Sequence, residues 1–100
     1  MRYLTFDFSE GADAETTIEA MASTTATDHR AVMTEVQQIL DWAWQNFPYT
    51  HGSSEDGADW DHDVQINVED GQWHAVTLTL TASTLFLNDF LAKFNVSLDE

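Results

Sequence analysis

Residues 64–82 read VQINVEDGQWHAVTLTLTA, and this stretch decides the kind of fold that the chain can adopt. Apolar and polar side chains alternate on both sides of Asp70-Gly71, with apolar residues at Val64, Ile66, Val68, Val76, Leu78 and Leu80. An alternation with period two is typical of a strand with one buried face. Asp-Gly between two such runs is a strong signal for a tight hairpin. The sequence therefore predicts two antiparallel strands, with the longer return strand at the centre of a sheet.

The remaining periodic segments predict one more strand and three helices. Residues 2–8 alternate in the same way and predict a strand at the other edge of the sheet. Residues 28–47 carry apolar side chains at helical spacing, and Pro48 ends that helix. The segment from Ser83 to Phe94 repeats the helical spacing. Residues 12–23 also fit a short helix, with inward positions at Ala14, Ile18, Met21 and Ala22.

The expected fold class is a small single α+β domain over residues 1–100, in the order β-α-α-β-β-α. The three expected strands form a mostly antiparallel sheet. Only one face of this sheet is apolar, so we expect all helices to cover that face.

The charge of the chain limits its partners. It carries 18 acidic residues against three basic ones, a formal net charge of −15. Such a field repels nucleic acid phosphates and anionic lipids, so we expect neither nucleic acid nor a membrane as partner. The negative field attracts cations or a basic protein partner instead. An alternative interpretation is adaptation to concentrated salt, where screening removes the self-repulsion of the acids.

Several classes of chemistry have no signal in this sequence. There is no cysteine, which excludes disulfides, a thiol nucleophile and Cys-ligated metals. The sequence shows no nucleophile elbow, phosphate-binding loop or dinucleotide fingerprint. It shows no secretory signal and no apolar run of membrane-spanning length. We therefore expect a cytoplasmic protein that is not an enzyme and has no cofactor.

Residues 51–63, HGSSEDGADWDHD, form the densest polar cluster. The candidate metal ligands within it are Asp59, Asp61, Asp63, His62 and His51. The three aspartates resemble the start of an EF-hand loop. The match then fails, because Val64 stands where glycine is needed and Asp70 where a bidentate glutamate belongs. A looser Ca²⁺ or Mg²⁺ site, a His/Asp transition-metal site and a solvated acidic loop all stay open.

The aromatic and threonine residues suggest contact surfaces for a partner. The candidates are Trp60, Trp42, Trp73, Thr77, Thr79 and Thr81. Trp60 stands among acids and either folds back onto the core or projects as an anchor. Trp42 lies off the main helical stripe. It either belongs to a surface patch that binds a partner or is covered by the loop that follows the helix. The threonine ladder predicts a flat, nearly uncharged sheet face for a homodimer or a partner, although threonine is also common on exposed strands.

The function expected from these features is a non-enzymatic protein-interaction module, which binds a basic partner or associates with itself. The alternative is a divalent-metal-binding protein, or a metal-dependent enzyme, that uses the Asp and His residues of 51–63.

Overall fold

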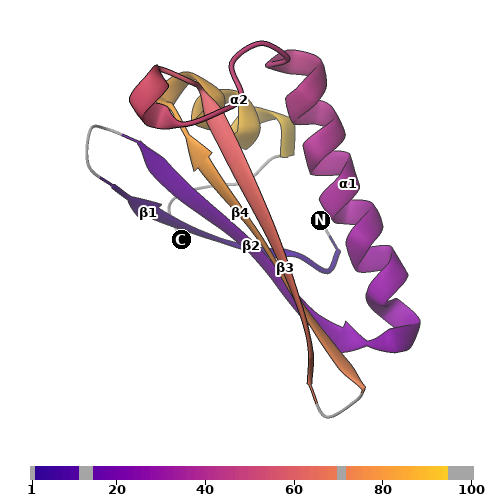
Figure 1. The fold of residues 1–100 in the computed structure, drawn as a ribbon. Helices are drawn as coiled ribbons and strands as arrows, with labels where there is room; N and C mark the ends of the chain where they lie inside the picture. Colours follow the sequence, from indigo (N-terminus) through magenta and orange to yellow (C-terminus); the bar gives the residue numbers. More distant parts are fainter. Residues whose placement is uncertain (1, 12–14, 70–71, 95–100) are drawn as a thin grey trace.

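The computed structural model describes residues 2–11, 15–69 and 72–94, which form a small β-β-α-β-β-α domain. Its elements are β1 (Thr5–Glu10), β2 (Thr16–Thr25), α1 (Ala26–Asn46), η2 (Ser54–Asp56), β3 (Trp60–Glu69), β4 (Trp73–Ala82) and α2 (Thr84–Phe94). The four strands form one antiparallel sheet in the order β1-β2-β4-β3. Helix α1 runs along this sheet, and β2, β3 and β4 extend beyond the short edge strand β1 (Figure 1). The predicted α+β class is confirmed.

The predicted strand count and topology were wrong, because residues 16–25 form strand β2 and not the second half of a helix. Ile18 and Ala22, four residues apart, lie on one side of the segment in a helix and in a strand alike. Pairing decides between them, since β2 bonds to β1 on one side and to β4 on the other. The threonines at both ends of β2 also favour a strand. Residues 12–14 lie outside the described ranges.

The other segments lie close to their predicted places. Strand β4 is central and β1 and β3 are the edges, as expected. Strand β3 begins at Trp60, four residues before the predicted start at Val64. The predicted Asp70-Gly71 turn lies outside the described residues, but Gln72 N–H donates to the Glu69 carbonyl at 3.1 Å across it. The hairpin predicted from residues 64–82 is therefore present as a strand pair.

Both helices cover the same face of the sheet. Among the described residues the buried apolar side chains are Leu4, Ile18, Ala20, Val32, Val36, Ile39, Ala43, Phe47, Trp60, Val76, Leu78, Leu80, Ala82, Phe86 and Phe90. The two helices touch where the ring of Trp42 meets that of Phe86 at 5.3 Å. On β1, Phe6 contacts Phe90 of α2 at 5.6 Å. No helix in the described ranges is long and apolar enough to cross a membrane.

The opposite face of the sheet is open and carries a row of acidic residues, which corrects in part the expectation of a nearly uncharged surface. Asp7, Glu19, Thr79 and Asp63 form one row of paired residues across all four strands. Glu19 is brought into this face by β2, the strand that the sequence did not predict. The described strand residues of this face include no Lys or Arg. Thr79 therefore lies between two carboxylates, whereas Thr77 pairs with Met21 and Gln65.

Glu35 ties the N-terminal segment to helix α1. Its carboxylate accepts hydrogen bonds of 3.0–3.1 Å from the backbone N–H groups of Arg2, Tyr3 and Leu4. Such charge-assisted bonds hold the buried Leu4 side chain in place.

Replacing Glu35 by alanine is expected to lower the free energy of unfolding by about 1–2 kcal/mol, because the three donors lose a common acceptor. Urea denaturation measures this loss. Thr34→Ala is the matched control, since the Thr34 hydroxyl is exposed and donates only to the Arg30 carbonyl within the same helix. Equal losses in the two variants would contradict the role assigned to Glu35.

Candidate functional site

The chain after α1 returns to the outer edge of β3 and brings His51 beside the start of that strand. His51 forms a parallel bridge with Trp60. Gly52 N–H donates to the Trp60 carbonyl at 2.9 Å, and Trp60 N–H donates to the Thr50 carbonyl at 3.3 Å. Gly52 has a φ of 150°, a conformation that favours glycine and lets the chain turn away at once. The bridge fixes His51 at the edge of the sheet.

Three of the five predicted metal ligands meet at this point. His51 Nε2 lies 2.9 Å from His62 Nδ1 and 3.1 Å from Asp61 Oδ1. All three ligand atoms lie within 4.8 Å of one another. The His51 side chain is 25% exposed and that of Asp61 is 45% exposed, so the group lies at the surface and is open to solvent. Among the described residues, His51, Asp61 and His62 are the one group of three or more His, Asp or Glu side chains close enough together to share a metal ion.

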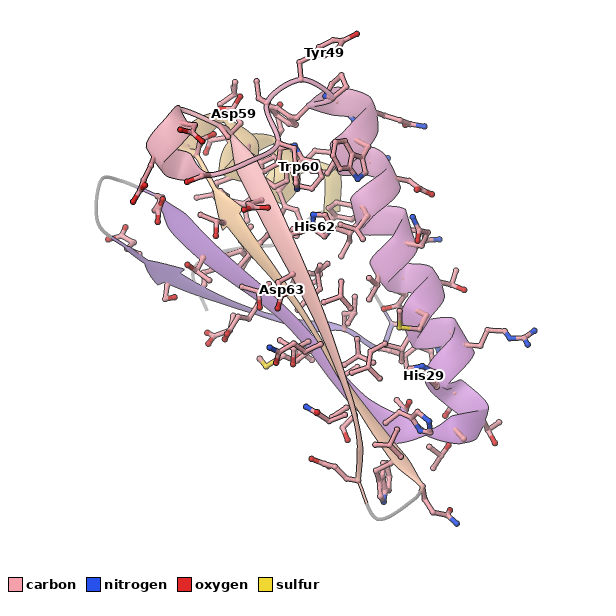
Figure 2. The ribbon with its side chains drawn as sticks, in the orientation of Figure 1. His29, Tyr49, Asp59, Trp60, His62 and Asp63 are labelled. Carbon is pink, nitrogen blue, oxygen red and sulfur yellow. The ribbon has the colours of Figure 1, made fainter. Side chains whose placement is uncertain are left out.

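Aromatic rings hold the two imidazoles in position. The ring of His51 lies 4.7 Å from that of Trp44 and 4.5 Å from that of Trp60. The ring of His62 stacks on Trp60 at 5.6 Å. Figure 2 shows Trp60 and His62 between β3 and α1, with Asp63 on the other side of the strand. The Asp61 carboxylate is held by the backbone N–H of His62 at 2.8 Å.

The other two predicted ligands do not join this group. Asp59 accepts a hydrogen bond of 2.8 Å from the Ser83 hydroxyl, which in turn accepts from Phe86 N–H at the start of α2. Asp63 is exposed on the open face. Asp61 and Asp63 lie on an extended strand, so their carboxylates are not wrapped around one point as in a calcium loop.

The outer edge of β3 is a second candidate site, and the sequence did not reveal it. Trp60 directs its N–H and carbonyl outward to residues 50–52. In an antiparallel ladder every second residue has this orientation, so the backbone groups of Val64, Ile66 and Val68 also point outward. No described segment pairs with β3 beyond the bridge at His51.

The side chains along this edge are unusually apolar for a solvent-exposed strand. Ile66 is 46% exposed and Val68 is 58% exposed, because α1 contacts β2 and β4 and leaves the end of β3 uncovered. The sequence correctly placed both residues on the apolar face of the sheet. It could not show that this face is wider than the helix that covers it.

The predicted contact residues lie in different environments. Trp60 is 1% exposed, so it belongs to the core and presents almost no surface to a partner. Trp42 is half-buried among the aromatic rings of α2. Trp73 is 46% exposed at the far end of the open face. The half-buried Thr77, Thr79 and Thr81 lie on that face, and only Thr79 has acidic residues on both neighbouring strands.

A hollow of about 290 Å³ lies near the start of α2. Glu15, Glu55 and Asp59 line it, together with Gly52, Ala58, Trp60 and residues 81–84. Three carboxylates around a small hollow suit a cationic group such as a lysine or arginine side chain. The hollow extends the negative charge of the open face.

Comparisons of the chain with protein-family models, with curated proteins and with solved structures found no significant match.

Proposed function

We propose that the protein is a non-enzymatic interaction module that binds a basic protein segment as an added strand along β3. The observation that carries this proposal is the free edge at Val64, Ile66 and Val68, with outward backbone groups and the exposed apolar side chains of Ile66 and Val68. An edge of this kind is a template for another chain. Strand addition uses the backbone for affinity and alternate side chains for specificity.

The two sides of β3 define the chemistry of the partner. On the helix side the partner strand meets Val64, Ile66 and Val68, which favour apolar residues. On the open side it meets Asp61, Asp63 and Glu69, which favour lysine or arginine. A segment with alternating apolar and basic residues therefore complements both sides.

A second copy of the chain is a poorer partner for this edge. If two β3 strands pair antiparallel with Ile66 opposite Ile66, Asp63 of each copy stands opposite Glu69 of the other. Like charges directly opposite each other destabilise a strand pair. Acidic residues on an edge thus oppose self-pairing while leaving the edge open to a cationic strand.

The net charge of −15 adds long-range attraction for such a partner. Electrostatic steering raises association rates by about 10- to 1,000-fold, and the gain falls steeply with ionic strength. Binding to a basic segment is therefore expected to weaken as salt increases.

A short peptide of alternating lysine and valine is expected to bind, whereas one of alternating glutamate and valine is not. Ile66→Pro removes an outward N–H and leaves the ladder to β4 intact, so it is expected to weaken binding at least tenfold, about 1.4 kcal/mol. Ile66→Thr keeps that N–H and the β-branched shape, and serves as the matched control. Fluorescence anisotropy at low and high salt measures these affinities.

Two results would contradict the proposal. One is equal binding of the lysine peptide to the wild type and to Ile66→Pro. The other is a dimer of the protein alone, seen in sedimentation, that Ile66→Pro dissociates, since the edge would then serve a second copy.

A further inference from the structure

We propose that His51, Asp61 and His62 bind a divalent transition-metal ion, with Zn²⁺ as the simplest example. This inference is independent of the proposed strand addition, because it rests on three ligand atoms at the opposite end of β3. Two imidazole nitrogens and one carboxylate oxygen are ligands that Zn²⁺, Ni²⁺ and Cu²⁺ accept.

The distances between the ligand atoms fit a shared ion. Two atoms that are each about 2.1 Å from one ion lie about 3.0 Å apart at a right angle and about 3.4 Å apart at the tetrahedral angle. The observed separations from His51 Nε2 are 2.9 Å to His62 Nδ1 and 3.1 Å to Asp61 Oδ1. His51 therefore needs only a small adjustment to share an ion with either neighbour.

The contacts at this point already require one shared hydrogen-bond donor. His51 Nε2 lies within hydrogen-bonding distance of both His62 Nδ1 and Asp61 Oδ1. One proton on His51 Nε2 satisfies both contacts, because it faces the nitrogen lone pair and the carboxylate together. When a metal ion replaces that proton at Nε2, the neutral His51 ring carries its proton on Nδ1 instead, and the three lone pairs converge on the ion.

The site is held by parts of the fold that do not depend on the ion. The bridge between His51 and Trp60 fixes the backbone of both segments. The rings of Trp44 and Trp60 restrict His51, and the N–H of His62 orients the Asp61 carboxylate. Such support around the ligands lowers the entropy that binding must remove. The half-exposed Asp61 leaves open positions where water completes the coordination of the ion.

The chemistry of the ligands favours transition metals over Ca²⁺ and Mg²⁺. Hard cations need several oxygen ligands around one centre. The described geometry supplies one carboxylate here, because Asp59 is bonded to Ser83 and Asp63 points to the open face.

Calorimetric titration of the full chain with Zn²⁺ tests this inference. We expect one saturable site, and a loss of affinity of at least tenfold in His51→Gln and in His62→Gln. Asp63→Asn and His74→Gln are the matched controls, since each removes a similar group outside the site, and both are expected to keep the wild-type affinity. In the NMR spectrum, Zn²⁺ should shift the ring protons of His51 and His62 and leave those of His29 and His74 in place.

The alternatives give distinct results. No heat with millimolar Zn²⁺ would overturn the inference. So would an equal loss of affinity in Asp63→Asn, because that pattern indicates loose attraction of cations to the acidic surface. Circular dichroism of each variant shows whether it is folded, and the ring-proton shifts of the wild type decide the question if a histidine variant does not fold.

Discussion

The free energy of unfolding is expected to rise by several kcal/mol when NaCl is increased from about 0.01 M to about 1 M. The chain has a formal net charge of −15 and a Cα radius of gyration of 13.8 Å. Folding brings these charges closer together, so their mutual repulsion opposes the folded state. Salt weakens this repulsion, and it does so more in the compact state than in the expanded chain.

A uniform sphere gives the scale of this effect. The radius of gyration of 13.8 Å corresponds to a sphere of about 18 Å radius, and the unfolded chain is about twice as large. Between about 0.01 M and 1 M salt, the self-repulsion falls from about 16 to 4 kcal/mol in the folded sphere and from about 5 to 1 kcal/mol in the expanded chain. The difference, about 8 kcal/mol, is an upper limit, because bound counterions reduce the effective charge.

Urea denaturation at several salt concentrations measures this dependence. KCl should act like NaCl, since screening depends on ionic strength and not on the identity of the cation. Glu19→Gln should flatten the salt dependence, because Glu19 stands directly opposite Asp7 across β1 and β2. A stability that does not change from low to molar salt would contradict the dominance of self-repulsion.

The part of the fold that the sequence predicted comes from segments with a single period. The alternation at Val76, Leu78 and Leu80 fits a strand and no helix, and these residues are buried on β4. The helix α1 was predicted within two residues at its start, and its apolar stripe from Val32 to Phe47 repeats over about four turns. In β2, however, Ile18 and Ala22 are four residues apart and share one face in either structure. Only the partners on each side select the strand, and those partners are remote in sequence.

The candidate metal site was predicted in part, for a similar reason. His51 and His62 were proposed together because both lie in one polar segment. Their meeting depends on the bridge between His51 and Trp60, which no local pattern indicates. Asp59, Asp61 and Asp63 suggested a loop, although they occupy the alternate positions of an extended segment. The free edge at Ile66 and Val68 depends on how far α1 reaches across the sheet, which the sequence does not encode locally.

Trp60 is the residue whose loss is expected to cost the most stability. Its side chain is 1% exposed, stacks on Phe86 at 5.6 Å and meets Trp44 at 4.8 Å. Its indole N–H donates to the Phe47 carbonyl at 2.9 Å, a buried bond that ties the end of α1 to the start of β3. Trp60 thus joins the core, the helix and the segment that carries His51.

Trp60→Ala is therefore expected to lower the free energy of unfolding by about 3–5 kcal/mol. A domain of this size has a total stability of about 5–15 kcal/mol, so the variant is best compared with the wild type in high salt. Trp60→Phe keeps most of the ring but leaves the Phe47 carbonyl without its donor, and we expect a smaller loss of about 1–3 kcal/mol.

Trp73→Ala, at a site that is 46% exposed, is the matched control and should change stability by less than about 1 kcal/mol. Equal losses at Trp60 and Trp73 would show that Trp60 does not join these parts of the fold, and the placement of His51 beside β3 would then lose its structural basis.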